Sequence, residues 1–176
     1  MKILFFGTPH FAEIVFKELV KKHEVVGVVC QEDKPANRGK KLQSPEIKAL
    51  AEGMGIKVFQ FPKLRDYIDE FKKIDCDIFV TASYGKILPK ALLDLKMCIN
   101  VHPSMLPKYR GATPIQTALL NGDKKTGVTI MKTDVGMDDG DIILQREVEI
   151  SGEDDYLSLT PKLADVGAEL LLEVLE

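Results

Sequence analysis

The chain has 176 residues, which is enough for one domain with a sizeable core and too few for two ordinary domains. Its composition is that of a soluble globular protein, and its net charge of −3 argues against a generic nucleic-acid-binding protein. The longest apolar runs, such as residues 3–6, are too short to cross a membrane, so no membrane association is expected. Three cysteines without Cys-x-x-Cys spacing predict buried free thiols in a reducing cytoplasm: Cys30, Cys76 and Cys98.

The first part of the chain alternates strands and helices. Residues 2–6 and 24–30 are apolar runs typical of strands, and residues 11–22 between them have apolar side chains at helical spacing. This βαβ unit implies parallel strands joined by a right-handed crossover. Residues 31–43 are predicted to be a loop. Ser44 is predicted to cap a short helix with Pro45 at its first position.

The alternation continues and then changes. The next predicted elements are a strand at 58–59, a helix at 64–73, a strand at 77–82, a helix at 89–95, a strand at 96–101 and a helix at 114–120. Residues 128–133 and 141–150 then alternate with period two and have no helix between them. They predict an antiparallel strand pair added to a mostly parallel sheet, before a last helix at 156–176. The fold class is therefore α/β, with residues 1–176 forming one domain.

The strand at 96–101 carries a pair of residues that could take part in catalysis. Asn100 and His102 are two residues apart, so both would project from the same face at the strand's carboxyl end, where open α/β sheets bind ligands. An amide donor beside a base that titrates near neutrality suits acyl-type chemistry. The alternative is that His102 is simply a buried, hydrogen-bonded histidine.

Other patterns are less specific. Residues 7–9 follow the first strand, but one glycine and a proline do not make a dinucleotide-binding turn. The acidic turn at 134–141 does not have calcium-loop spacing, although one of its carboxylates could orient His102. His10, His23 and His102 are too scattered for a zinc site. The basic segment at 34–41 is either a solvated surface loop or a local nucleic-acid contact.

Several blocks together resemble the methionyl-tRNA formyltransferases. They are Gly7-Thr8-Pro9-x-Phe11-Ala12, Lys34-Pro35-Ala36-x-Arg38-Gly39-Lys40-Lys41-Leu42, Ser83-Tyr84-Gly85-x-Ile87-Leu88-Pro89, Asn100-Val101-His102-x-Ser104-x-Leu106-Pro107-x-Tyr109-Arg110-Gly111, and Asp134-x-Gly136-x-Asp138-x-Gly140-Asp141. The resemblance implies a three-layer, Rossmann-like formyltransferase fold. It also implies a cytoplasmic, monomeric enzyme that moves a formyl group from 10-formyltetrahydrofolate to the α-amine of methionyl initiator tRNA in translation initiation. Enzymes of this kind also carry a C-terminal β-barrel domain, which is expected to be absent from this chain.

The resemblance also implies roles for individual residues. Asn100, His102 and Asp138 match the catalytic triad, in which Asn100 and His102 are expected to stabilise a tetrahedral oxyanion with Asp138 assisting, and no metal is implied. The residues that match the tetrahydrofolate site are Ser104, Met105, Leu106, Pro107, Tyr84 and Gly85, and the Leu106–Pro107 bond is expected to be cis. The residues expected at the acceptor side are Gly7, Thr8, Pro9, Phe11, Arg38, Lys40, Lys41 and Arg110, with the basic loop on the tRNA acceptor stem.

Three alternatives stay open on the sequence. The same fold could formylate a sugar or nucleotide amine, or it could hydrolyse formyltetrahydrofolate with water as the nucleophile. The chain could instead be a non-catalytic module that binds folate or RNA, although binding alone does not require the Asn/His/Asp set. Asp154-Asp155-Tyr156 replaces the threonine-containing entry to the last helix that is usual in the resembled enzymes, so a different helix cap is expected there.

Overall fold

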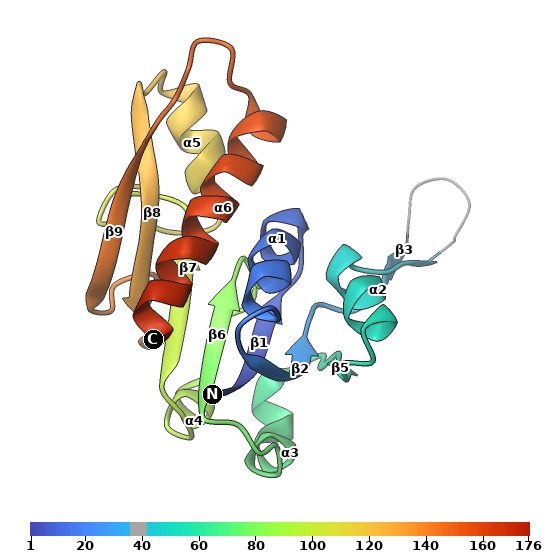
Figure 1. Ribbon diagram of the computed structural model, residues 1–176. Helices are drawn as coiled ribbons and strands as arrows, with labels where there is room; N and C mark the ends of the chain where they lie inside the picture. The colour runs from blue at the N-terminus through green and yellow to red at the C-terminus, as the bar shows by residue number, and fades with distance from the viewer. Residues whose placement is uncertain (36–41) are drawn as a thin grey trace.

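The computed structural model describes residues 1–35 and 42–176 (Figure 1). Its centre is a seven-stranded sheet with the order β5-β2-β1-β6-β7-β8-β9. The strands are β1 (Lys2–Gly7), β2 (Glu24–Val29), β5 (Val58–Phe59), β6 (Ile78–Ala82), β7 (Cys98–His102), β8 (Lys125–Lys132) and β9 (Ile142–Glu149). The strands from β5 to β7 pair in parallel, whereas β8 and β9 are antiparallel to their neighbours. The predicted fold class, including the added antiparallel pair, is confirmed.

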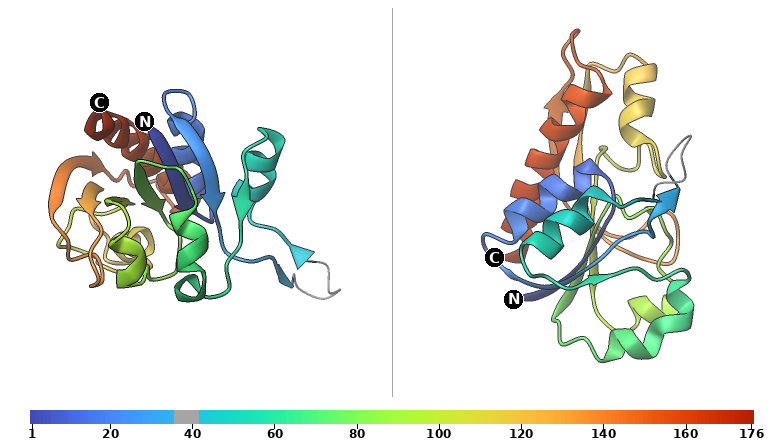
Figure 2. Two further views of the ribbon diagram at one scale, coloured as in Figure 1. Left: turned by 90° about the horizontal axis from the view of Figure 1, so that it is seen from below. Right: turned by 90° about the vertical axis from the view of Figure 1, so that its right-hand side faces the viewer.

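Helices cover both faces of this sheet. They are α1 (His10–Leu19), α2 (Glu46–Gly53), the 3-10 helix η1 (Leu64–Tyr67), α3 (Ile68–Lys72), α4 (Lys90–Leu93), α5 (Pro114–Leu120) and α6 (Tyr156–Leu175). In the right-hand view of Figure 2, α1, α2 and α6 lie on one side of the sheet and α3 and α4 on the other. The architecture therefore has three layers.

The core divides at the sheet because side chains alternate along each strand. In β1, Ile3 and Phe5 belong to the cluster under α1 and α6, whereas Leu4 and Phe6 belong to the cluster under α3 and α4. All four side chains are fully buried. A strand that is covered on both faces reads as a continuous apolar run, which is why β1 and β6 could be recognised from the sequence.

Some predicted boundaries were wrong. Helix α1 ends at Leu19 instead of residue 22, because residues 20–23 turn back toward β2 through hydrogen bonds to the helix carbonyls. The predicted loop at 31–43 contains two very short antiparallel strands, β3 (Lys34–Pro35) and β4 (Leu42–Gln43). The helix at 64–73 begins as the 3-10 helix η1. Ser44 does not cap α2, because the helix starts one residue later, with Pro45 at the N-cap position and no side-chain cap.

The unusual entry to α6 is well capped. The Asp155 carboxylate accepts a hydrogen bond from the Ser158 backbone N–H at 2.9 Å, and the Ser158 hydroxyl accepts one from the Asp155 N–H at 3.0 Å. This reciprocal pair is a capping box, which satisfies two backbone donors that a helix start leaves free. The departure at residues 154–156 therefore leaves the last helix with a complete N-terminal cap.

The three cysteines are free and buried, as predicted. Burial raises the pKa of the Cys30 thiol to about 11 and that of the Cys98 thiol to about 12. Thiols with such pKa values are poor nucleophiles at neutral pH, so they serve as small core side chains. Among the described residues, no helix combines the length and the apolar character that crossing a membrane requires.

Candidate active site

The larger of two neighbouring cavities opens where the parallel strands end. It has a volume of about 560 Å³ and is lined by residues that follow β1, β6 and β7, together with residues 133–138 of the β8–β9 turn. Because parallel strands end at the same edge of a sheet, β6 and β7 bring their last residues together there. Asn100 and His102 both line this cavity, as expected from their spacing on β7.

Asn100 is oriented by the neighbouring strand. Thr81 on β6 is its register partner, and the Thr81 hydroxyl donates to the Asn100 side-chain oxygen at 2.8 Å. With that oxygen engaged, the amide nitrogen points toward Asp138 and lies 3.4 Å from its Oδ1. The opposite amide orientation would set two oxygens against each other, so Thr81 and Asp138 together fix a donor at the cavity wall.

His102 is buried, with only 4% of its surface exposed. Its Nε2 donates to the backbone carbonyl of Tyr109 at 2.9 Å, and its Nδ1 lies 3.6 Å from Oδ2 of Asp138. A carbonyl can only accept, so the proton on Nε2 follows from this contact. Nδ1 is then the ring nitrogen that faces the carboxylate.

Asp138 joins the two β7 side chains. Its Oδ2 accepts a hydrogen bond from the Gly111 N–H at 2.7 Å, and its Oδ1 accepts the longer bond from Asn100. The turn between β8 and β9 thus supplies a carboxylate beside His102. The structure brings together the three residues that the sequence placed in a triad, and their catalytic roles remain predictions.

Backbone strain is concentrated around this cavity. In the part of the chain that the structure describes, the non-glycine residues with left-handed φ are Ser83 at 47°, Tyr109 at 57° and Asp138 at 49°. Ser83 and Asp138 line the cavity, and Tyr109 holds His102. Such conformations persist when the surrounding structure enforces them, and they cluster at functional sites.

The predicted acceptor-side residues take different places. Thr8, Pro9 and Phe11 line the larger cavity. Gly7 does not, and a Cβ atom there would lie 2.5 Å from that of Ala12, so Gly7 serves the close packing of β1 on α1. Arg110 is exposed and is not part of the cavity lining. Three further residues lie outside the described residues: Arg38, Lys40 and Lys41.

The predicted folate segment lies apart from the cavity. Ser104, Met105, Leu106 and Pro107 are absent from its lining, and Ser104 is fully buried with its hydroxyl bound to the Lys108 carbonyl. The Leu106–Pro107 bond is cis, as expected. The role assigned to this segment stays a prediction, and its visible contacts hold the chain that follows β7.

Tyr84 and Gly85 both border the cavity, but the Tyr84 ring turns away into the core. The ring is buried and lies 5.5 Å from the ring of Phe6, and burial raises the pKa of its hydroxyl. Its backbone carbonyl accepts hydrogen bonds from the Thr8 hydroxyl and the Gln31 side chain. The backbone of Tyr84 therefore joins the ends of β1 and β2 to the turn after β6.

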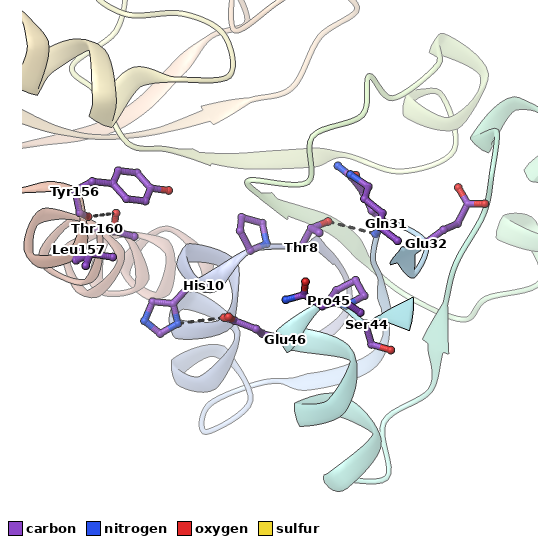
Figure 3. A pocket seen from close by; sticks show the side chains of 13 residues that line it. Thr8, His10, Gln31, Glu32, Ser44, Pro45, Glu46, Tyr156, Leu157 and Thr160 are labelled. Atoms are coloured by element: carbon purple, nitrogen blue, oxygen red, sulfur yellow. Dashed lines mark hydrogen bonds and ion pairs between the residues drawn. The ribbon is translucent and has the colours of Figure 1, made fainter. Parts of the chain in front are cut away.

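A smaller cavity of about 390 Å³ adjoins the first one (Figure 3). The two share five lining residues: Thr8, Pro9, Gln31, Lys34 and Tyr156. Figure 3 shows His10 at the start of α1 facing Glu46 at the start of α2, with Nδ1 of His10 3.5 Å from the carboxylate. Ligand atoms of His10, Glu13 and Glu46 lie within 4.8 Å of one another, and Glu13 also pairs with Lys17.

Thr81 is the member of this site that sequence reasoning missed. It lies inside an apolar run and belongs to no recognised motif. Its only signal is a hydroxyl near the end of a buried strand that pairs with the strand carrying Asn100. That signal becomes useful only once the pairing of β6 with β7 is known.

Comparison with known proteins defines the family. A model described as formyl transferase matches residues 1–175, so the chain belongs to the formyl transferase family. A methionyl-tRNA formyltransferase of Thermodesulfovibrio yellowstonii is 48% identical over 179 residues, a match that covers 99% of this chain and 58% of that protein. A methionyl-tRNA formyltransferase of Kosmotoga olearia is also 48% identical, over 181 residues, and the match covers 100% of this chain and 58% of that protein.

A solved structure agrees with this placement. The phosphoribosylglycinamide formyltransferase of Bacillus halodurans superposes with a TM-score of 0.78 at 27% identity, covering 97% of this chain and 91% of that one. The chain thus spans nearly all of that enzyme's length, but only 58% of the length of the two curated relatives.

Proposed function

We propose that this chain transfers a formyl group from 10-formyltetrahydrofolate to the α-amine of methionyl initiator tRNA. The observation that carries the proposal is the placement of Asn100 and His102 beside Asp138 at the wall of the larger cavity, where the Asn100 amide donates to the carboxylate and Nδ1 of His102 lies 3.6 Å from it. The 48% identity to methionyl-tRNA formyltransferases supports the choice of acceptor. The reaction belongs to translation initiation in the cytoplasm, with the chain acting as a monomer.

Asn100 acts on the developing charge. The amine attacks the formyl carbon, a new C–N bond forms, and the carbonyl oxygen becomes an oxyanion. One N–H of the Asn100 amide points toward Asp138, which leaves its second N–H to donate to that oxyanion. Removing one such donor typically costs about 2.7–4 kcal/mol of transition-state stabilisation.

His102 moves the proton. Its Nδ1 accepts the proton that the attacking amine loses and passes it to N10 of the folate as the C–N10 bond breaks. Asp138 lies against the same ring nitrogen and stabilises the protonated ring while it carries that proton. These steps require neither a metal nor a covalent enzyme intermediate.

The acceptor approaches from the side shared by the two cavities. Thr8, Pro9 and Phe11 lie beside the methionine end of the substrate in this arrangement. Arg38 and Lys41, outside the described residues, contact the acceptor stem. The double variant Arg38→Ala with Lys41→Ala is expected to raise the KM for tRNA and to leave the KM for the folate unchanged. An unchanged KM for tRNA would indicate that these residues are solvated surface charges with no role in tRNA binding.

An acceptor panel tests the function. The chain is given 10-formyltetrahydrofolate with methionyl initiator tRNA, with a nucleotide-linked amino sugar, with glycinamide ribonucleotide, or with no acceptor. The full-length Thermodesulfovibrio yellowstonii relative is assayed in parallel. Formylation of methionyl-tRNA is expected to be fastest. Preference for another amine, or folate release without an acceptor, would identify an amine formyltransferase of another kind or a hydrolase.

A further inference from the structure

Tyr109 holds His102 through a backbone conformation that tyrosine rarely adopts. Its φ of 57° lies in the left-handed region, where a side chain with a Cβ atom is strained. This conformation directs the Tyr109 carbonyl at Nε2 of His102, 2.9 Å away. Something in the structure must keep the residue in this state.

The side chain of Tyr109 is anchored at the turn after α5. Its phenol hydroxyl donates to the Asp123 carboxylate at 2.6 Å and accepts from the Asn121 side chain at 3.0 Å. A hydrogen bond from a hydroxyl to a carboxylate is among the stronger kinds in proteins. These bonds fix the side chain of Tyr109, the residue whose backbone carbonyl contacts His102.

The backbone before Tyr109 is fixed independently. The Ser104 hydroxyl donates to the Lys108 carbonyl at 2.6 Å, and the Thr129 hydroxyl on β8 donates to the Ser104 carbonyl at 2.7 Å. Thr129 also accepts from the Leu106 N–H at 3.1 Å. These bonds tie the segment between β7 and Tyr109 to the sheet, so the Tyr109 carbonyl is held from both sides.

This carbonyl decides which nitrogen of a neutral His102 carries the proton. A neutral imidazole has one N–H, and here an acceptor faces each ring nitrogen. The carbonyl at Nε2 is within hydrogen-bond distance, whereas the Asp138 oxygen is 3.6 Å from Nδ1. Without the carbonyl, the carboxylate would favour a proton on Nδ1, and that nitrogen could no longer act as a base.

We propose that Tyr109 is a positioning residue for the formyl transfer. Its anchored carbonyl keeps neutral His102 protonated on Nε2, and Nδ1 remains free to take the proton of the attacking amine. The effect on the reaction rate rests on the proposed function, whereas the effect on the tautomer does not.

The test combines histidine ¹⁵N NMR with kinetics. In the wild-type chain at a pH where His102 is neutral, the spectrum is expected to show the Nε2–H form. Tyr109→Phe removes the phenol anchor, so the Nδ1–H form is expected to appear. With the base misaligned, kcat should fall about tenfold while the KM for 10-formyltetrahydrofolate stays unchanged. Asp123→Asn, which weakens the same anchor, should change both readouts in the same direction by less.

Tyr67→Phe is the matched control, because Tyr67 packs against Phe61 away from the cavity. It should change neither readout, and thermal unfolding shows that each variant is folded. A wild-type ring protonated on Nδ1 would overturn the proposal, as would a folded Tyr109→Phe variant with an unchanged tautomer or an unchanged kcat. The NMR measurement needs no substrate, so a chain that shows the expected tautomers but transfers no formyl group would contradict the proposed function alone.

Discussion

The two adjoining cavities differ in how their polar residues are held. In the larger one, the side chain of His102 is 5% exposed and its partner Asp138 is 17% exposed, and each makes a further bond to the backbone. In the smaller one, His10 is 56% exposed and Glu46 is 61% exposed. Both cavities contain a histidine beside a carboxylate, but the pair in the larger one is mostly buried and bonded to the backbone, whereas His10 is exposed and is held by another side chain, Glu13, at 3.1 Å.

This difference separates chemistry from binding. A catalytic group must keep its orientation as charge develops, and buried partners provide that constraint. An exposed pair exchanges its partners for water at little cost, so it can contact a substrate without directing a reaction. The larger cavity is therefore the expected site of formyl transfer, and the smaller one an extension along the acceptor.

The largest expected effect compares the two histidines. His102→Ala should lower kcat by about 100- to 1,000-fold, comparable with the loss of an oxyanion donor. His10→Ala is the matched change in the smaller cavity. It should leave kcat within about twofold, since substitutions at exposed positions rarely disturb the rest of the structure. Steady-state formyl transfer measures both. Similar losses in the two variants would remove the distinction between the cavities.

The next effect concerns Thr81, which orients Asn100. Thr81→Val removes the hydroxyl bonded to the amide oxygen, so kcat should fall about fivefold, the equivalent of one hydrogen bond of about 1 kcal/mol. Thr126→Val is the control, because Thr126 is equally buried but its hydroxyl has no partner among the described residues. If both variants keep full activity, Asn100 does not depend on Thr81 for its orientation.

A smaller effect on stability is expected at Tyr84. Its buried hydroxyl has no partner in the described part of the chain, so Tyr84→Phe should raise the free energy of unfolding by about 1 kcal/mol. The KM for 10-formyltetrahydrofolate should not change, because the ring lies in the aromatic cluster with Phe6. Chemical denaturation and steady-state kinetics measure the two quantities. An increased KM would indicate that the Tyr84 hydroxyl contacts 10-formyltetrahydrofolate.

The smallest effect concerns the first turn of α6, which lines the smaller cavity. Hydrogen bonds from Lys162, Ser151 and Ser158 hold the pKa of the Asp154 carboxyl well below its usual range. A lowered folded-state pKa gives stability that is present above the unfolded value near pH 4 and is lost as the pH falls through the folded value.

Asp154→Asn should therefore lower the Tm at pH 7, and its difference from the wild type should shrink below about pH 4. Glu153→Gln, at an exposed neighbouring position, is the control and should leave the Tm unchanged at both pH values. A Tm difference that is the same at neutral and acid pH would show that the Asp154 charge does not stabilise the start of α6.

The fold could be predicted well because its signals are local. The apolar run of β1 reports burial on two faces, and the mixed polar and apolar residues of β9 report a partly exposed edge strand. The sequence of β8 also alternates, but the strand is buried from Thr126 to Met131. The pairing of Lys34–Pro35 with Leu42–Gln43 was missed, since two-residue strands leave no periodicity. The start of α2 was misplaced because Ser44 and Pro45 are both residues that commonly begin a helix.

The site was only partly predictable. The i, i+2 spacing on a strand is enough to place Asn100 beside His102. Asp138 lies on a distant turn and could be chosen from several nearby acids only by resemblance. Thr81 and Tyr109 act through a cross-strand pair and a left-handed backbone, and neither contact is encoded in a short sequence pattern.

Asn100, Asp138 and His102 are expected to act as one unit on one formyl group. A double-mutant cycle on kcat for methionyl-tRNA formylation, with Asn100→Ala, His102→Ala and the double variant, tests it most directly. If the two residues act as a unit, the double variant should be little slower than the slower single variant. If the two losses multiply, the residues act independently and the account is wrong.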